Sequence, residues 1–206
     1  MNRGAELRNA FGEIDIYLFD QLLRGRFDDR SRILDAGCGS GRNLVYFLRS
    51  GFDVFGIDRD PAAVARVRAL AAEIAPALAA GHFHVGELVS LPWPGEAFDA
   101  VVCSAVLHFA ESEDHFERML VEMWRVLRPG GLLFVRLASV IGLEGAVPMD
   151  RNRRARLPDG SVRFLVDEAM LLGWTARLGA ELLDPIKTTN VQNQRCMTTW
   201  VLRKHA

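Results

Sequence analysis

The chain has 206 residues, half of them apolar and a quarter charged, with a formal net charge of −1. We predict one domain over residues 1–206, without a nucleic-acid partner, because this length suits one sizeable core and the charge provides no global positive field. No apolar run can span a bilayer, the first residues lack a signal core, and the three cysteines are scattered, so we expect a cytoplasmic monomer or homodimer without a membrane partner or metal site.

The first predicted element is a helix within residues 1–25. Phe11, Ile14, Leu18 and Leu22 recur at helical spacing, and Gly25 follows as a stop signal. Such a helix could simply pack on the sheet or could cover a bound ligand. We assign it as a lid.

Residues 33–43, ILDAGCGSGRN, combine a strand, a tight turn and the start of a helix. The apolar run reaches Asp35 and then breaks into glycines at every second position, before a helical pattern over residues 43–49. Glycine allows sharp turns and close approach of a ligand, and a helix start offers unpaired N–H groups. The three glycines are Gly37, Gly39 and Gly41.

Strands and helices alternate through most of the remaining chain. Asp60 followed by Pro61, and Ser112 followed by acids, are typical of helix starts. Residues 139–161 form an irregular insert that we place on the substrate side. The predicted later strands cover residues 52–58, 82–85, 98–104, 132–138, 182–189 and 196–203, with a further helix over 167–177.

This alternation predicts a doubly wound, mostly parallel α/β sheet with helices on both faces, and the short final connection predicts an antiparallel last pair. Ligands of such sheets bind at the C-terminal strand ends. Dinucleotide sites there read G-x-G-x-x-G, whereas this chain has G-x-G-x-G preceded by an acid. Asp35 suits an ammonium group, and Asp58 suits a ribose diol. Together they favour an amino acid joined to a nucleoside.

Four segments resemble those of class I S-adenosylmethionine-dependent methyltransferases. They are LDAGCGSGRN (34–43), GIDRDP (56–61), FDAVVCSAVLHF (98–109) and RVLRPGGLLFV (125–135). The resemblance covers nearly the whole chain. It implies a Rossmann-like sheet of seven strands, with the last strand antiparallel and inserted beside the sixth. It also implies S-adenosylmethionine as cofactor and S-adenosylhomocysteine as product.

The same resemblance implies roles for individual residues. The loop from Gly37 to Gly41 would hold the methionine moiety, with Asp35 near its ammonium; Asp58 would bind the ribose hydroxyls, and Arg59 would lie along the adenine. Glu87 and Leu88 stand where the family often has Asp and an apolar residue near the adenine amine. The full predicted cofactor set is Asp35, Gly37, Cys38, Gly39, Gly41, Asn43, Asp58, Arg59, Glu87, Leu88, Ser104 and Leu107.

His108 is the candidate catalytic residue, because it follows the fourth main strand and histidine can accept a proton near neutral pH. It could instead be a structural residue that closes the loop, or a residue that only contacts the cofactor. A weaker likeness, carried by the GRN after the glycines, is to bacterial small-molecule methyltransferases, and we carry no substrate over from it. We expect a small-molecule acceptor because the chain lacks the basic bias of nucleic-acid enzymes. The alternative is a non-catalytic cofactor-binding sensor or scaffold. An arginine cluster could attract an anionic substrate or form a solvated loop; it comprises Arg151, Arg153, Arg154 and Arg156.

Overall fold

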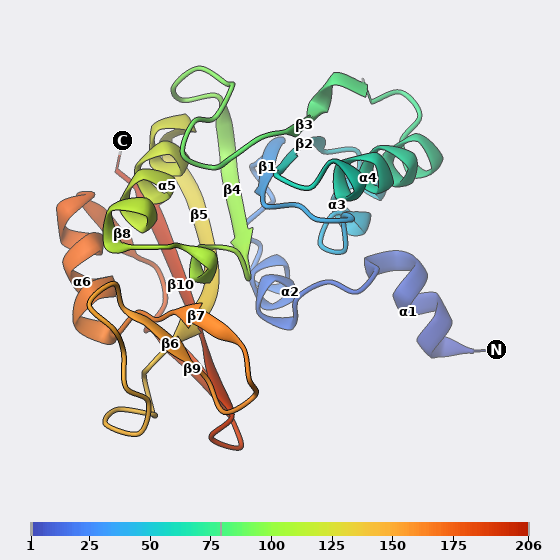
Figure 1. Cartoon of the computed structure of the whole chain (residues 1–206). Helices are drawn as coiled ribbons and strands as arrows, with labels where there is room; N and C mark the ends of the chain where they lie inside the picture. The colour runs from blue at the N-terminus through green and yellow to red at the C-terminus, as the bar shows by residue number, and fades with distance from the viewer. Residues whose placement is uncertain (1, 79, 206) are drawn as a thin grey trace.

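The computed structural model describes residues 2–78 and 80–205 (Figure 1). The two ends of the predicted domain, Met1 and Ala206, lie outside the described residues. Within these residues, eight strands form one sheet. They are β1 (Arg32–Ala36), β2 (Asp53–Asp58), β3 (Phe83–Val85), β4 (Phe98–Ser104), β5 (Leu127–Ser139), β8 (Ala180–Leu182), β9 (Lys187–Val191) and β10 (Arg195–Lys204).

The strand order is β3-β2-β1-β4-β5-β10-β8, with β9 also paired to β10. The first five strands are parallel, and β10 is antiparallel to both of its neighbours. This arrangement confirms the predicted Rossmann-like sheet with an inserted antiparallel last strand. The eighth strand arises because the predicted strand 182–189 is interrupted between Leu182 and Lys187. Pro185, which has no N–H to donate to a ladder, lies in that gap.

Helices cover both faces of the sheet, as predicted. They are α1 (Arg3–Phe11), α2 (Ile16–Leu23), α3 (Val45–Arg49), α4 (Pro61–Ile74), α5 (Glu113–Val126) and α6 (Glu168–Arg177). Figure 1 shows α3 and α4 on one side of the sheet and α5 and α6 on the other. One core layer contains Phe47 and Val64, and the other contains Phe116 and Trp174. Because β4 lies between these layers, all seven of its residues are buried.

Side-chain caps begin the long helices where the sequence predicts them. The Asp60 carboxylate accepts a hydrogen bond from the Ala62 N–H at 2.9 Å, and Pro61 occupies the first turn of α4. The Ser112 hydroxyl accepts one from the His115 N–H at 3.1 Å at the start of α5. These caps orient the helices that follow β2 and β4, and so position the loops at the C-terminal edge of the sheet.

The N-terminal region contains two helices, so the prediction of one helix within residues 1–25 is wrong. Gly12, at φ +65°, ends α1, and Asp15 caps α2 by accepting a hydrogen bond from the Tyr17 N–H at 3.0 Å. The apolar spacing missed this break because Phe11 and Leu18 belong to different helices. None of the residues of α1 is buried, whereas Leu18 of α2 is fully buried.

The predicted irregular insert, residues 139–161, ends in a small hairpin. Strand β6 (Arg154–Arg156) pairs antiparallel with β7 (Val162–Phe164), outside the main sheet. Two short 3-10 turns, η1 (Ala80–His82) and η2 (Leu107–Phe109), complete the secondary structure of the described residues. Across the same residues, no helix combines the length and apolar character needed to cross a membrane.

Candidate functional site

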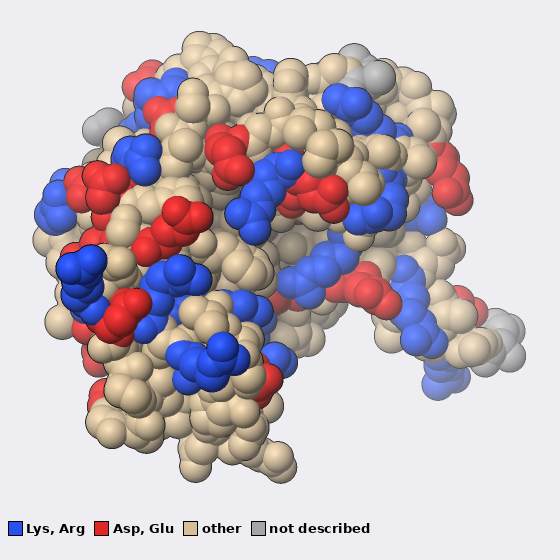
Figure 2. Space-filling model, viewed as in Figure 1, with Lys and Arg blue, Asp and Glu red and all other residues tan. Residues whose placement is uncertain are grey.

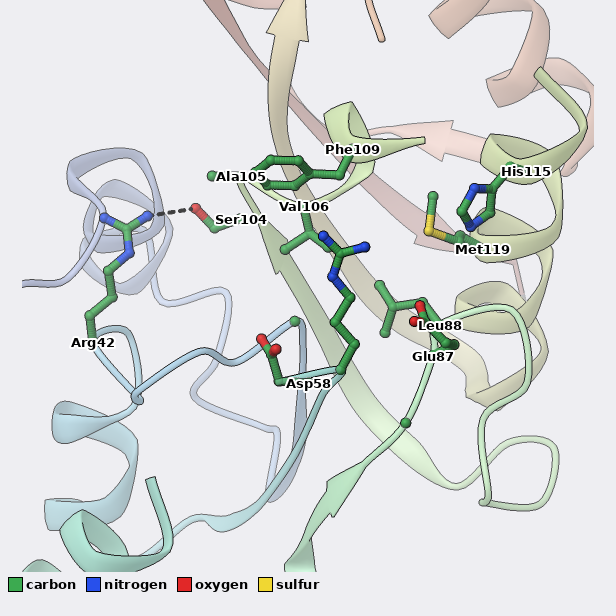
Figure 3. Close-up of a pocket in the computed structure, with 13 residues that line it drawn as sticks. Arg42, Asp58, Glu87, Leu88, Ser104, Ala105, Val106, Phe109, His115 and Met119 are labelled. Carbon is green, nitrogen blue, oxygen red and sulfur yellow. Dashed lines mark hydrogen bonds between the residues drawn. The ribbon is translucent and has the colours of Figure 1, made fainter. Parts of the chain in front are cut away.

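A cavity of about 510 Å³ opens at the C-terminal ends of β1, β2 and β4 (Figure 3). Six residues of the predicted cofactor set line it: Gly37, Asp58, Arg59, Glu87, Leu88 and Ser104. The sequence prediction missed further lining residues after β4 and on α5, which are Ala105, Val106, Phe109, His115 and Met119. Figure 3 shows Val106 and Phe109 over one side of the cavity and His115 and Met119 on another. The strand-end rule therefore located the cavity correctly.

The glycine turn follows β1 and adopts a backbone that requires glycine. Gly37 has φ +84°, and a Cβ at this position would lie 2.3 Å from a methyl group of Val106. The amides of this turn are already used: the Gly37 N–H donates to the Ile57 carbonyl at 2.8 Å, and the Gly39 N–H donates to the Asp58 carboxylate at 2.9 Å. The turn thus brings the β1 and β2 ends together, and a ligand would meet its glycine surface.

Asp35, at the end of β1, is a buried carboxylate without a partner. Its exposure is 1%, and neither carboxylate oxygen has a hydrogen-bond partner among the described residues. Burial raises the pKa of Asp35 to about 7. Leaving such a group uncompensated is costly, so the position suits a ligand that brings a cation or a strong donor.

Asp58 occupies the end of β2 in a fixed orientation. One carboxylate oxygen accepts the Gly39 N–H and the other accepts the Asp60 N–H, both at 2.9 Å. Each oxygen retains a second acceptor position, because a carboxylate has about four lone-pair sites. Asp58 therefore offers two anchored acceptors to the cavity, as a pair of vicinal hydroxyls would require.

An unpredicted polar network closes the other end of the cavity. Arg42, from the glycine turn, donates to the Ser104 hydroxyl at 3.3 Å, which Figure 3 marks with a dashed line. Ser104 donates to the buried carboxylate of Asp15 at 3.2 Å, and Arg136 of β5 donates to the same oxygen at 3.0 Å. Asp15, which caps α2, thereby connects the glycine turn with β4 and β5.

Six predicted cofactor residues do not line the cavity: Asp35, Cys38, Gly39, Gly41, Asn43 and Leu107. Gly39 nevertheless bears on it by donating to the Asp58 carboxylate, and Asp35 stands two residues before Gly37, which lines it. The others have packing roles in this structure. Burial raises the pKa of the Cys38 thiol, Asn43 accepts the Asp15 N–H at 3.0 Å, and Leu107 is fully buried in the core.

His108 lines a second cavity of about 350 Å³, which adjoins the first. Its Nδ1 accepts the Ala138 N–H at 3.2 Å, which assigns the ring proton of the neutral form to Nε2. Burial, with contributions from Arg163, Arg136 and Arg195, lowers the pKa of His108 to about 3. At neutral pH the ring is an N–H donor, and this geometry does not favour the predicted role in proton acceptance.

The predicted arginine cluster does not contribute to either cavity. Arg153 forms an ion pair with Asp167 at 2.5 Å, and Arg156 donates to the Gly160 carbonyl at 3.0 Å. The arginines that line the second cavity are Arg136, Arg163 and Arg195. They come from β5, β7 and β10, which are far apart in the sequence.

Comparisons with known proteins agree with this geometry. Residues 34–135 match the family model described as "Methyltransferase domain". A protein named tRNA U34 carboxymethyltransferase from Azotobacter vinelandii is 35% identical over 184 residues, covering 87% of this chain and 53% of that protein. Its namesake from Idiomarina loihiensis is 31% identical over 188 residues, covering 88% and 56%. This chain therefore spans about half the length of these curated relatives.

A solved structure supports the fold. The crystal structure of Burkholderia thailandensis 1,6-didemethyltoxoflavin-N1-methyltransferase, with bound 1,6-didemethyltoxoflavin and S-adenosylhomocysteine, matches with a TM-score of 0.68 at 19% identity. The match covers 90% of this chain and 76% of that chain.

The names of the curated relatives contradict the prediction of a small-molecule acceptor and no nucleic-acid partner, and that prediction is wrong. It rested on the net charge of the whole chain, which does not reveal that three arginines gather at one cavity. The family prediction, by contrast, is confirmed by the matched domain and the strand order. The chain belongs to the class I family of S-adenosylmethionine-dependent methyltransferases.

Proposed function

We propose that the first cavity binds S-adenosylmethionine and that the chain transfers its methyl group to a tRNA. The assignment of the cofactor rests mainly on Asp35, a buried carboxylate that has no partner among the described residues and stands directly before the glycine turn. An amino-acid ammonium would supply the missing cation. When bound, S-adenosylmethionine supplies a sulfonium methyl group with a good leaving group.

Other residues of the cavity fit the remaining groups of the cofactor. Arg42, whose side chain is 46% exposed at the cavity wall, would pair with the methionine carboxylate. Asp58 would accept the two ribose hydroxyls through its anchored oxygens. Arg59 and Leu88 line the cavity and would contact the adenine. Glu87, one methylene longer than aspartate, would accept from the adenine amine.

The chain's own part in the reaction is to position the acceptor and exclude water. Val106, Phe109 and Met119 provide apolar walls, and a fixed approach geometry can by itself accelerate a transfer greatly. His108 presents a neutral N–H toward the adjoining cavity, so we assign it to orienting the acceptor.

The tRNA acceptor is supported by the two relatives named tRNA U34 carboxymethyltransferase. The second cavity, lined by three arginines beside the first, provides the positive charge that a nucleic acid needs locally. We also propose a cytoplasmic location, consistent with three free and buried cysteines.

The test has two stages. Calorimetry with S-adenosylhomocysteine should give clear binding, whereas NAD and NADP should give none of comparable strength. The protein is then incubated with S-adenosylmethionine and total tRNA, and the tRNA is digested to nucleosides for mass spectrometry. We expect one uridine-derived nucleoside to gain the mass of a methyl group.

In a parallel incubation, the donor is a carboxymethyl sulfonium analogue of S-adenosylmethionine. Modification with this donor alone would correct the transferred group and keep the acceptor. Asp58→Ala serves as the matched control, since it should lose both binding and modification. Tight binding of NAD or NADP without binding of S-adenosylhomocysteine would overturn the cofactor assignment. An unmodified tRNA pool, together with transfer to a metabolite, would overturn the acceptor.

A further inference from the structure

The second cavity is a basic chamber at the end of the sheet. Arg136, Arg163 and Arg195 line it, and Asp159 is the acidic residue among its lining. Asp15 pairs with Arg136 at 3.0 Å, and Asp159 pairs with Arg195 at 3.5 Å. Three positive charges therefore face two negative charges, which leaves an excess positive charge.

Two of the arginines have donor capacity that the protein leaves unused. The Arg163 side chain takes part in no ion pair among the described residues, and the one hydrogen bond of its guanidinium, at 2.8 Å, is to the carbonyl of the preceding residue. The Nε of Arg136 is buried and has no hydrogen-bond partner among these residues. The neutral His108 ring adds a further N–H at the same wall. A group of converging donors of this kind suits a phosphate or carboxylate oxygen.

Phe109 joins the two cavities. It lines both of them, together with Ala105, and it is 47% exposed despite its apolar ring. The guanidinium of Arg163 lies 4.7 Å from the centre of this ring. An exposed aromatic ring beside arginines is the arrangement on which unpaired nucleic-acid bases stack. Figure 2 shows that the face drawn is hollowed near its centre, with Lys and Arg side chains beside the hollow.

On the basis of the tRNA acceptor proposed above, we infer that the two features form one nucleotide subsite. The Phe109 ring receives an unpaired base of the acceptor, and the second cavity binds the adjacent phosphate through Arg163, Arg136, Arg195 and the His108 N–H. The base then lies at the junction of the cavities, where it faces the first cavity across Ala105.

The inference is tested with simple probes on the full chain saturated with S-adenosylhomocysteine. Calorimetry compares uridine 5′-monophosphate, uridine and inorganic phosphate. We expect the monophosphate to bind at least about tenfold more tightly than uridine, because charge-assisted hydrogen bonds to phosphate are strong. It should also bind more tightly than inorganic phosphate, because the base adds stacking on Phe109.

The variants separate the two contacts. Arg163→Met should remove most of the advantage of the monophosphate over uridine, and Phe109→Leu should weaken uridine and monophosphate alike by about fivefold or more. Arg151→Met, in the neighbouring insert and outside both cavities, is the matched control and should bind like the wild type. Binding of S-adenosylhomocysteine and the melting temperature, measured for each variant, report an intact fold.

The outcomes distinguish this inference from the proposed function. If S-adenosylhomocysteine binds but uridine 5′-monophosphate and uridine bind with equal affinity, the phosphate subsite is wrong while the cofactor site stands. If inorganic phosphate binds as tightly as the monophosphate, the cavity holds a free anion and the nucleotide subsite is also wrong. If S-adenosylhomocysteine itself does not bind, the proposed cofactor site is wrong, and the inference that rests on it is wrong too.

Discussion

Replacing Asp35 by asparagine tests the cofactor site through a property of the free protein. Burial raises the pKa of Asp35 to about 7, compared with about 3.9 in an unfolded chain. The folded state therefore binds more protons than the unfolded state between these values. A raised carboxyl pKa means that stability falls as the pH rises through this window.

The magnitude follows from the two pKa values. Between about pH 5 and pH 8, the titration of Asp35 should lower the free energy of unfolding by roughly 2–3 kcal/mol. An asparagine side chain does not titrate, so the Asp35→Asn variant should lack this part of the pH dependence. Urea unfolding of both proteins, without ligand, at the two pH values measures the difference, in which the contributions of other groups cancel.

Ligand binding should ionise the Asp35 carboxyl group, which burial keeps protonated in the free protein below about pH 7. If an ammonium pairs with Asp35, binding of S-adenosylhomocysteine should ionise it and release about 0.9 proton near pH 6, and about 0.1 near pH 8. Calorimetry in buffers of different ionisation enthalpy counts these protons. The asparagine variant should release none and bind more weakly. Equal pH dependence of stability in the two proteins, or equal affinity, would refute the role of Asp35.

Three further predictions concern the same cavity and the N-terminal helix. Asp58→Ala should weaken S-adenosylhomocysteine binding at least about tenfold in calorimetry, because two charge-assisted hydrogen bonds are lost; unchanged affinity would exclude it as the ribose acid. Gly37→Ala should lower the free energy of unfolding, measured in urea, by about 1–3 kcal/mol, since its Cβ would lie 2.3 Å from Val106. Gly39→Ala should lower it by less, because a Cβ there meets nothing within 4 Å. Deleting residues 1–11 should change stability by less than about 1 kcal/mol, because no residue of α1 is buried; if binding of the homocysteine product is also unchanged, the lid prediction is wrong for α1.

The sheet and the first cavity could be predicted because their signals are local. Each parallel strand is a short apolar run followed by a turn, and the informative residues, Asp35, Asp58 and Glu87, stand directly after such runs. The strand-end rule then brings them together without any knowledge of long-range contacts. The same local logic found the caps at Asp60 and Ser112.

The polar network and the second cavity could not be predicted in this way. Asp15 and Arg136 are 121 positions apart, and nothing near either residue indicates their contact. Arg163 and Arg195 reach the cavity from β7 and β10, whose placement depends on pairings that the sequence pattern leaves open. His108 was located next to the site, but the hydrogen bond that determines its tautomer comes from the backbone of β5.

In the proposed reaction, S-adenosylmethionine bound in the first cavity gives its methyl group to a tRNA. The most direct measurement incubates the protein with S-adenosylmethionine labelled in the methyl group, in a cell extract depleted of proteins, and separates tRNA from small molecules before counting. We expect the label in the tRNA fraction, with the Asp58→Ala protein giving little. Label confined to the small-molecule fraction would contradict the acceptor, and its absence from both fractions would contradict methyl transfer itself.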